Sequence, residues 1–425
     1  MSLKKKITFI FLAIISLLIL SLITLKNNYQ LRQNVLNLFP EKYVVIIKII
    51  FGDKKYLLQN LNDYNVKFLP ETQFINLDFN KIKIKNLDIK SVGYNQKLKG
   101  NYFSFNINQY LNKIILTTRS EIIYINTKDL EKTSLLAKRI NHNLPINIDI
   151  KDSKIFNEEI FISFSEHNKL KNCKNLVLSK AIFNLESLVF KEIIKFDECA
   201  NYIQGGKIDV FKVLDQNKIL ISTAGDILAF KNERDPKPQD DKSIFGKILL
   251  VDEYKKSFNI FSKGHRNPLG LLYDKKNKII FSTENGPRGG DEINLIKLGQ
   301  NYGWDIVSYG ERYSSNDENY KKNHEQLGFQ EPIYSFVPSI GISEIIKLEN
   351  NFSKKWKNNF LIGSLNSKHL YRIKLNANFS KLIYKEKIFI GERIRDILYL
   401  KNEKIILLAL ENTGSIGILR VNNKL

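Results

Sequence analysis

The chain has 425 residues, of which 43% are hydrophobic and 11% aromatic, and this is enough apolar material to exclude a mainly disordered protein. Lys and Arg together number 66 against 44 Asp and Glu, which gives a formal net charge of +22. The lysines are scattered in ones and twos. The charge therefore argues against nucleic-acid binding, which needs a focused basic patch, and leaves an attraction for anionic small molecules or lipids.

Cysteine and histidine usage narrows the possible metal and redox sites. Two cysteines, Cys173 and Cys199, exclude a multi-disulfide scaffold and a Cys-rich zinc or iron–sulfur site. The five histidines show neither HxxxH nor HExxH spacing, so a helical metalloprotease site is excluded as well. A single bridge between the cysteines and a pair of free buried thiols both remain open.

The amino terminus carries a membrane-targeting pattern. Lys4, Lys5 and Lys6 precede a run from Ile7 to Leu25 in which nothing is more polar than Ser or Thr, about the length that spans a bilayer as a helix. The positive flank places the amino end in the cytoplasm. We interpret residues 1–26 as an uncleaved signal anchor and the remainder as exported, on the periplasmic side of the inner membrane. A cleaved leader is the alternative.

Beyond the anchor, short β-branched and aromatic runs dominate. One pattern, a turn with Asn or Glu followed by a strand of about five residues, occurs in six copies, which begin at Asn112, Glu159, Asn217, Asn277, Asn359 and Glu403. Their spacing is close to the blade period of a β-propeller once loop insertions are allowed. The pattern predicts an all-β, six-bladed propeller over residues 91–425, with residues 27–90 as a juxtamembrane stalk outside the repeat. The alternative is that an AT-rich genome generates such strings by composition.

The stretch from Gly264 to Trp304 is the most informative part of the chain. It reads GHRNPLGLLYD (264–274), STENGPRGGDEINLI (282–296) and GQNYGW (299–304). Clustered Gly and Pro allow backbone carbonyls to approach a ligand closely, and Arg266 supplies a planar fork of donors for carboxylate or quinone oxygens. Taken alone, a tight propeller connection explains the glycines nearly as well.

In this order and spacing the segments resemble the PQQ-dependent glucose/sorbosone dehydrogenase family, soluble aldose dehydrogenases built as six-bladed propellers. Four further segments also resemble the family's strands: GGKI (205–208), GKIL (246–249), VPSI (337–340) and RIRD (393–396). The collinear resemblance runs from about Asn112 to the carboxyl end. It implies oxidation of an aldose at C1, with hydride passing to PQQ while Ca²⁺ polarises the cofactor.

The resemblance also implies site residues. Arg393 and Arg395 match the family's pair of cofactor-binding arginines, as PQQ carries three carboxylates that need cationic partners. Arg266 and Asn267 match residues beside the quinone oxygens, where developing negative charge needs a donor, so Arg266 is also the catalytic candidate. The Ca²⁺ ligands would be the backbone carbonyls of Gly286 and Pro287 (residues 286–287).

The chain departs from the family at three positions. Ile203 stands where the family has its general-base histidine, and isoleucine cannot accept a proton. Asn366 replaces a cofactor-binding lysine, for which Lys368 is a possible substitute, and the family's glycine-rich segment before the second blade has no match in residues 143–147. Gln204 and Asp209 are the nearest candidates to replace the base, although an amide has no suitable pKa.

Several motif residues also have purely structural interpretations. His265 precedes Arg266 in a turn and is expected to be structural rather than a replacement base. Asp291 and Glu292 either hold their loop by accepting backbone hydrogen bonds or contribute to a Ca²⁺ site. Trp304 is expected in the core, and the two RIRD arginines could instead form ion pairs that close the propeller.

Two functions follow from these observations. The first is a divergent, membrane-anchored, periplasmic PQQ-dependent aldose dehydrogenase with a small-molecule sugar and PQQ as its partners. The second is a non-catalytic propeller that binds a sugar, an anion or a partner protein. Ile203 is the residue that separates them, because a missing base typically lowers the rate by about 10²–10⁴.

Overall fold

Six β-sheets form the part of the chain that can be described. The computed structural model describes residues 75–85, 103–225, 237–312, 319–349 and 351–422. The predicted anchor at residues 7–25 lies outside these ranges. Within them, no helix is long and apolar enough to cross a membrane.

Each sheet is one blade, and the blades are numbered by the order of their innermost strands along the chain. Blade 1 contains β2 (Asn106–Tyr110), β3 (Lys113–Thr117), β4 (Ile122–Asn126), β6 (Lys138–His142) and β10 (Ser187–Leu188). Blade 2 contains β7 (Asp149–Phe156), β8 (Glu159–Asn168), β9 (Cys173–Ile182) and β11 (Lys191–Ala200). Blade 3 contains β12 (Gly205–Val213), β13 (Gln216–Thr223), β14 (Lys247–Asp252) and β15 (Ser257–Lys263).

The other three blades complete the ring. Blade 4 contains β16 (Pro268–Asp274), β17 (Ile279–Glu284), β18 (Asp291–Ile296) and β19 (Tyr334–Phe336). Blade 5 contains β20 (Ile342–Lys347), β21 (Phe360–Ser364), β22 (His369–Leu375) and β23 (Leu382–Phe389). Blade 6 contains β24 (Ile394–Leu400), β25 (Ile405–Leu410), β26 (Ser415–Val421), β1 (Leu77–Lys85) and β5 (Ser134–Leu136). The described 3₁₀ turns are η5 (Thr127–Glu131), η7 (Glu325–Leu327) and η8 (Lys354–Trp356).

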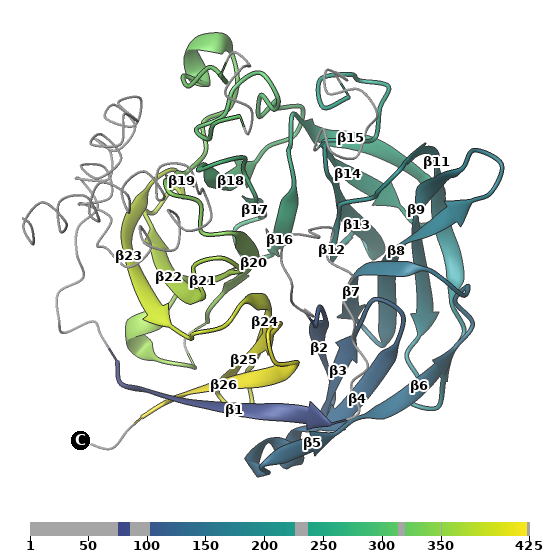
Figure 1. Ribbon diagram of the computed structural model, residues 1–425, viewed down its shortest axis with the longest axis vertical. Helices are drawn as coiled ribbons and strands as arrows, with labels where there is room; N and C mark the ends of the chain where they lie inside the picture. The colour runs from purple at the N-terminus through teal and green to yellow at the C-terminus, as the bar shows by residue number, and fades with distance from the viewer. Residues whose placement is uncertain (1–74, 86–102, 226–236, 313–318, 350, 423–425) are drawn as a thin grey trace, which may run out of the picture. The chain divides into compact units, whose positions relative to one another are not determined.

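The innermost strands close into a ring around a central axis (Figure 1). Each of the strands β2, β7, β12, β16, β20 and β24 contacts the next, and β24 returns to contact β2. Large apolar clusters fill the space between neighbouring blades. The prediction of a six-bladed propeller is therefore confirmed.

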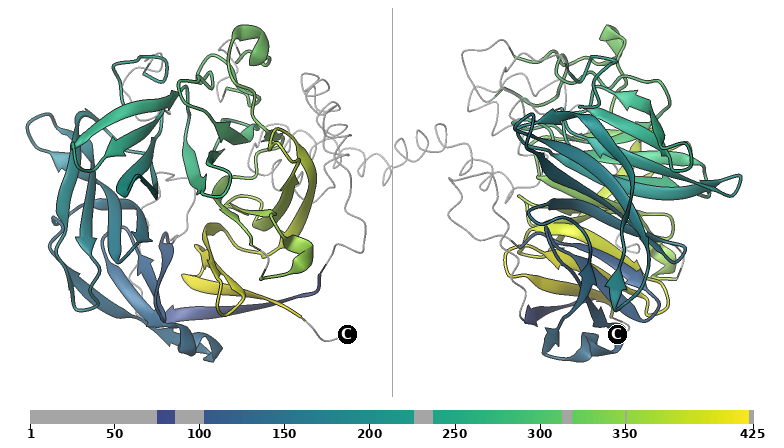
Figure 2. Two further views of the ribbon diagram at one scale, coloured as in Figure 1. Left: turned by 180° about the vertical axis from the view of Figure 1, so that it is seen from behind. Right: turned by 90° about the vertical axis from the view of Figure 1, so that its right-hand side faces the viewer.

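The start of the propeller lies earlier in the chain than the sequence suggested. Strand β1 falls inside residues 27–90, which we expected outside the repeat, yet it pairs antiparallel with β26 from Leu77 opposite Val421 to Lys83 opposite Ser415. It runs along the outer side of blade 6 (Figure 2). Without β1 the backbone groups of β26 would form an open sheet edge. The boundary at residue 91 is therefore wrong at its amino-terminal side, because β1 completes the last blade.

The six sequence copies have one structural role: each is the second strand of its blade, namely β3, β8, β13, β17, β21 and β25. The hydroxyl residues at the ends of several copies are buried and reach the innermost strand of the next blade. Ser163 Oγ donates to the carbonyl of Gly206 at 2.5 Å, and Ser222 Oγ donates to that of Pro268 at 3.3 Å. These bonds explain why a small hydroxylic residue recurs there.

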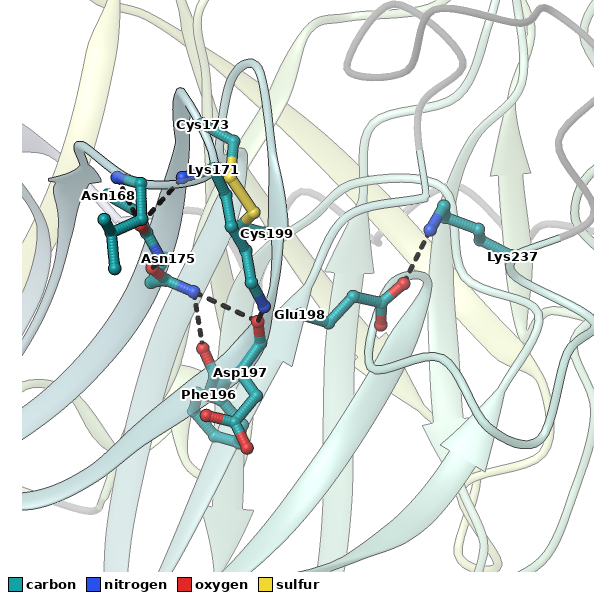
Figure 3. Close-up of a disulfide and its surroundings, with 10 residues drawn as sticks. Asn168, Lys171, Cys173, Asn175, Phe196, Asp197, Glu198, Cys199 and Lys237 are labelled. Atoms are coloured by element: carbon teal, nitrogen blue, oxygen red, sulfur yellow. Dashed lines mark hydrogen bonds and ion pairs between the residues drawn. A yellow bond between two sulfur atoms is a disulfide. The ribbon is translucent and has the colours of Figure 1, made fainter.

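Cys173 and Cys199 form a disulfide, which settles the alternative left open by the sequence. Their Cα atoms are 5.8 Å apart, and the bridge ties the start of β9 to the end of β11 (Figure 3). Beside it, Asn175 Nδ2 donates to the carbonyl of Phe196 at 2.8 Å. The bridge thus fixes the strand that leads directly into residues 200–205, the connection between blades 2 and 3.

Candidate cofactor site at the mouth of the propeller

The predicted site residues gather at one end of the propeller, which we call the mouth: the end at which the six innermost strands begin. Hydrogen bonds join its loops from blade to blade. They run from Gly225 N to Arg266 O (2.8 Å), from Arg266 Nη1 to Asn285 O (2.8 Å), from Ser339 Oγ to Pro287 O (3.2 Å) and from Arg393 Nη1 to Leu365 O (3.3 Å). The structure therefore brings the predicted residues of blades 4, 5 and 6 into one set of connected loops.

Arg266 is held rigidly at the entry to β16. Its Nη1 donates to the carbonyls of Asn285 and Gly286, at 2.8 and 3.0 Å. Its guanidinium carbon lies 5.4 Å from the ring centroid of Trp304, a favourable cation–π distance. Trp304 is buried, as expected, and its Nε1 donates to Gly225 O at 2.8 Å. The side chain of Arg266 is thus oriented before any ligand binds.

His265 is structural, as the sequence indicated. It is fully buried, and both ring nitrogens have partners: Nδ1 lies 3.0 Å from Glu284 Oε2, and Nε2 lies 2.8 Å from Ser262 Oγ. Its ring stacks on Tyr302 at 4.7 Å. A histidine engaged in this way is not placed to take a proton from a substrate in the mouth.

Asp291 holds the Gly-rich loop. One carboxylate oxygen accepts the backbone N–H of Gly286 at 3.0 Å, and the other accepts those of Ile340 and Ile342, both at 2.9 Å. This loop-holding role is one of the two interpretations that the sequence left open. Burial raises the pKa of the Asp291 carboxyl, and these backbone donors act in the opposite direction.

Glu292 shares a small cavity with Glu284. Burial, with the nearby charge of Glu284 as the second cause, raises the pKa of Glu292 well above its ordinary value. The cavity, also lined by Arg266, has a volume of about 10 Å³, room for roughly one water molecule. Among the residues that the structure describes, no group of three acidic, His or Cys side chains is placed to hold a metal ion.

The two carbonyls expected to bind Ca²⁺ already accept hydrogen bonds. Gly286 O accepts from the guanidinium of Arg266 at 3.0 Å, and Pro287 O accepts from Ser339 Oγ at 3.2 Å. A positive guanidinium next to one proposed ligand repels a second cation. As these residues lie, they do not fit a Ca²⁺ ion, and no chemical step below depends on one.

Arg393 and Arg395 share one buried carboxylate, that of Glu411. Arg393 Nε lies 2.8 Å from Glu411 Oε2, and Arg395 Nε lies 2.5 Å from Oε1. Burial alone would raise the pKa of Glu411, but the two guanidiniums outweigh burial and hold it below its ordinary value. The arginines do form ion pairs, as one interpretation expected, and the shared carboxylate orients both guanidiniums at the mouth.

Asn366 and Asn267 flank this cationic pair and Arg266, respectively. The backbone N–H of Asn366 donates to Ile340 O at 2.9 Å, and this bond fixes the β21–β22 loop, which also carries Lys368. Asn267 O accepts from Asn285 N at 2.9 Å, whereas its side-chain Oδ1 is buried and has no hydrogen-bond partner among the described residues. A buried polar atom without a partner needs an explanation, and a polar ligand in the mouth supplies one.

The residue at the family's base position is buried in the apolar core and not in the mouth. Ile203 is 1% exposed and packs in the apolar cluster that includes Phe196 and Phe245. Neither suggested replacement serves as a base. Gln204 carries an amide, and Asp209 is already engaged by Tyr273 N at 2.7 Å and by Lys154 Nζ at 3.0 Å.

The structure adds a charged group at the mouth that the sequence did not single out. Arg119, in the turn between β3 and β4, donates two hydrogen bonds to the carboxylate of Asp149, from Nε at 2.6 Å and from Nη2 at 2.5 Å. Lys151 Nζ contacts the same carboxylate at 2.6 Å. Lys151 Nζ also lies 5.0 Å from the ring centroid of Tyr202. The alternation Asp149–Ile150–Lys151 at the start of a strand was the available signal, because it puts two charges on one face.

Below the mouth, a second charged group lies on the innermost strands and surrounds the axis. Lys207 Nζ lies 2.9 Å from Asp152 and 2.5 Å from Glu344. Asp152 also accepts from Ile208 N at 2.9 Å, and Asp396 accepts from Ile107 N at 2.7 Å. Burial, the largest cause, raises the pKa of Glu344 to about 7. These carboxylates join the innermost strands of neighbouring blades.

Comparison with known proteins agrees with this geometry. Residues 146–420 match the model of the family described as Glucose / Sorbosone dehydrogenase. The chain belongs to this family. Within it, the chain is 27% identical over 201 residues to the aldose sugar dehydrogenase YliI of Escherichia coli, which covers 44% of this chain and 54% of that protein. It is 29% identical over 177 residues to the uncharacterized protein slr1608 of Synechocystis, 42% of each chain. The chain thus matches about half the length of these relatives.

Solved structures share the fold. A glucose dehydrogenase structure superposes with a TM-score of 0.63 at 21% identity, over 75% of this chain and 96% of that one. The apo form of the soluble aldose sugar dehydrogenase from Escherichia coli gives 0.61 at 18% identity, over 82% and 100%. The PQQ-bound aldose sugar dehydrogenase of Streptomyces coelicolor gives 0.54 at 18%, over 82% and 99%. At these identities the likeness supports the propeller architecture.

Proposed function

We propose that this family member is a PQQ-dependent sugar dehydrogenase that binds the cofactor at the mouth. The observation that carries the proposal is the pair Arg393 and Arg395, whose guanidiniums start blade 6 side by side and are both oriented by the buried carboxylate of Glu411. A planar, multiply anionic cofactor is the kind of ligand that such a pair binds. The names of the related proteins, among them a quinoprotein glucose dehydrogenase B of Acinetobacter calcoaceticus, point to the same cofactor.

The chain's own residues would do three things. Arg393 and Arg395 would bind carboxylates, Arg266 would donate to an oxygen that gains negative charge, and the buried amide of Asn267 would hydrogen-bond the ligand in the mouth. PQQ, when bound, supplies the hydride acceptor. The loops that carry these groups are joined by backbone hydrogen bonds, so the donors are oriented in advance.

The test is a titration of the purified full-length protein with PQQ, followed by addition of aldoses and an artificial electron acceptor. The double variant Arg393→Gln with Arg395→Gln removes both cations, and hydrogen bonds to charged groups contribute about 1.5–3 kcal/mol each. We expect its PQQ affinity to fall by at least about 100-fold. Arg139→Gln is the matched control, because Arg139 is an exposed residue paired with Glu121. Equal affinity in the double variant and the parent would refute the cofactor role, and a parallel titration with a Ca²⁺ chelator shows whether that ion contributes.

The buried position of Ile203 favours a second candidate, a propeller that binds a sugar or another anion without oxidising it. In that case the PQQ-loaded protein would reduce no acceptor dye with any aldose. Rapid dye reduction by the unmodified protein would instead show that a residue other than 203 takes the proton.

We further propose that the protein acts on the periplasmic side of the inner membrane, anchored by residues 7–25. Two features support this: the apolar amino-terminal run, and the Cys173–Cys199 bridge, since disulfides persist in oxidising compartments. Amino-terminal sequencing of protein taken from membranes checks the anchor. A mature chain that starts near residue 27 would show that the segment is a cleaved leader.

A further inference from the structure

The mouth contains a second cationic group, separate from the Arg393–Arg395 pair, and it surrounds Tyr202. Lys151 Nζ and Lys174 Nζ lie 5.0 and 5.9 Å from the centroid of its ring. Arg119 and Arg395 are close enough for their charges to act on its phenol, as is the carboxylate of Asp149. Among the described residues, four cationic side chains therefore surround one tyrosine; Asp149 is the carboxylate partner of Arg119 and Lys151, and Glu411 is that of Arg395.

Burial makes this concentration of positive charge unfavourable. The side chain of Lys151 is only 9% exposed. Burial is the main cause that lowers its pKa; Asp149 opposes the effect, and the neighbouring charges of Arg119 and Lys174 add to it. A bound anion would offset both the repulsion and part of the lost solvation. Asp149 cannot do this alone, because Arg119 and Lys151 share its one negative charge.

The group comes from different blades than the cofactor-binding pair. Arg119 lies in blade 1, and Lys151 and Lys174 lie in blade 2, whereas Arg393 and Arg395 start blade 6. Each set is organised by its own carboxylate, Asp149 in one case and Glu411 in the other. The mouth thus has two cationic centres, and Arg395 of the second is close enough to act on Tyr202 of the first.

We propose that the centre formed by Arg119, Lys151 and Lys174 binds the negative group of an anionic sugar, one that carries a carboxylate or a phosphate. The inference rests on the proposed function, because it assigns the substrate class of the same mouth. A neutral aldose has no group that would need this centre. The adjacent Tyr202 offers an aromatic face and a hydroxyl, a combination suited to a ligand with both polar and apolar surfaces.

The test measures binding directly, by calorimetry on the full-length protein with and without PQQ. The probes are glucuronate, glucose 6-phosphate, glucose and inorganic phosphate. We expect one or both anionic sugars to bind at least about 10-fold more tightly than glucose, and the difference to shrink when salt is raised to about 0.5 M. Binding that favours glucuronate identifies a carboxylate as the recognised group, and binding that favours glucose 6-phosphate identifies a phosphate.

Variants locate the site. Lys151→Gln and Lys174→Gln should each lower the affinity for the anionic sugar by about 5–10-fold or more, and each should change the affinity for glucose little. Lys174 has no ion pair to lose among the described residues and lies on a different strand, so its variant keeps the test available if the Lys151 variant is unstable. The matched control is Lys218→Gln, which removes a lysine paired with Asp252 in blade 3 and should leave all affinities unchanged.

Three results would overturn the inference. The first is that neither anionic sugar binds more tightly than glucose, and the second is that inorganic phosphate alone binds as tightly as the sugars. The third is that Lys151→Gln weakens PQQ as strongly as it weakens the sugar, since the lysines would then belong to the cofactor site. A protein that fails to bind PQQ refutes the proposed function instead, and anionic-sugar binding to the cofactor-free protein still decides this inference.

Discussion

The part of the mouth that blades 1, 2 and 6 contribute and the axis layer below it differ in charge. Among the described residues, this part of the mouth has five cations and two carboxylates: Arg119, Lys151, Lys174, Arg393 and Arg395 with Asp149 and Glu411. The axis layer has two cations and four carboxylates: Lys154 and Lys207 with Asp152, Asp209, Glu344 and Asp396. The same β scaffold therefore supports two very different electrostatic environments.

The difference lies in what can neutralise each excess. Surplus carboxylates in the axis layer accept backbone N–H groups of neighbouring strands, as Asp152 does from Ile208 and Asp209 does from Tyr273. Backbone donors stabilise a charged carboxylate, so the axis layer is satisfied by the fold itself. Surplus cations at the mouth call for an anion, and this is the physical reason to expect ligands there and a structural role below.

We expect the largest effect on stability when the central cation of the axis layer, Lys207, is removed. Lys207→Met leaves Asp152 and Glu344 buried without their shared partner, and breaking a buried ion pair typically costs about 3–5 kcal/mol. We expect a loss of that size in the free energy of unfolding, measured by urea denaturation. Lys218→Met, at a partly exposed pair, should cost about 1 kcal/mol or less. Equal losses in the two variants would contradict the structural role of the axis layer.

The covalent support of the mouth gives the next largest effect. Cys173→Ser combined with Cys199→Ser removes a bridge between residues 26 positions apart, which should lower stability by roughly 3 kcal/mol. Thermal unfolding measures the loss. The parent protein with its bridge reduced is the control and should behave like the double variant. If the double variant unfolded at the same temperature as the oxidised parent, the bridge would contribute nothing to the stability of the strand that leads into the mouth.

The axis layer also predicts a pH dependence of the free energy of unfolding. Burial raises the pKa of Glu344 from 4.5 to about 7, so the folded state holds this proton more tightly than the unfolded state. The associated stability is fully present below pH 4.5 and is lost as the pH rises through about 7. The change is on the order of 3 kcal/mol.

Glu344→Gln should therefore flatten the dependence of unfolding free energy on pH over this window, with Glu349→Gln, an exposed site paired with Lys401, as the control. An unchanged slope in the Glu344 variant would mean that the pH response originates elsewhere.

The smallest expected effect concerns the hydroxyl contacts between blades. Ser343 Oγ donates to Ile394 O at 2.6 Å, and both residues are buried. Ser343→Ala removes this donor and should cost about 1–3 kcal/mol, toward the lower end because the carbonyl keeps other interactions. The exposed turn residue Ser380 is the control. A neutral Ser343→Ala would show that these hydroxyls are kept for their size alone.

Most of the fold was predictable because the propeller repeats a local pattern. The second strand of each blade has a turn, an apolar run and a hydroxyl end, and all three features lie within a short segment. Strand β1 was missed for the opposite reason. Its alternating sequence predicts a strand, but its partner β26 is at the other end of the chain, and no local pattern reveals such a pairing.

The candidate site likewise contains residues that local motifs predict and residues that only the folded structure brings together. Arg266, Asn267, Arg393 and Arg395 lie in motifs that could be recognised along the sequence. The carboxylate that orients the two arginines could not be recognised in this way, because Glu411 meets them only when β24 and β25 pair, where its backbone N–H donates to Arg393 O at 2.9 Å. The orientation of Ile203 into the core was likewise decided by packing between blades 2 and 3. Residues 1–74, including the predicted anchor, lie outside the described part of the chain.

The pairing of β1 with β26 has a consequence for the order in which the molecule is built. Lys83 and Ser415 face each other across about 330 residues of chain, so a strand made early must wait for one of the last segments to be synthesised. Domains generally gain structure from the amino end during synthesis. Blades 3 to 5 each consist of consecutive strands and can pair as they emerge, whereas blade 6 cannot. β1 also pairs in parallel with the early strand β5, so until the final hairpin arrives only the edge of β1 that faces β26 is open, and closure of the ring is the step that protects this edge.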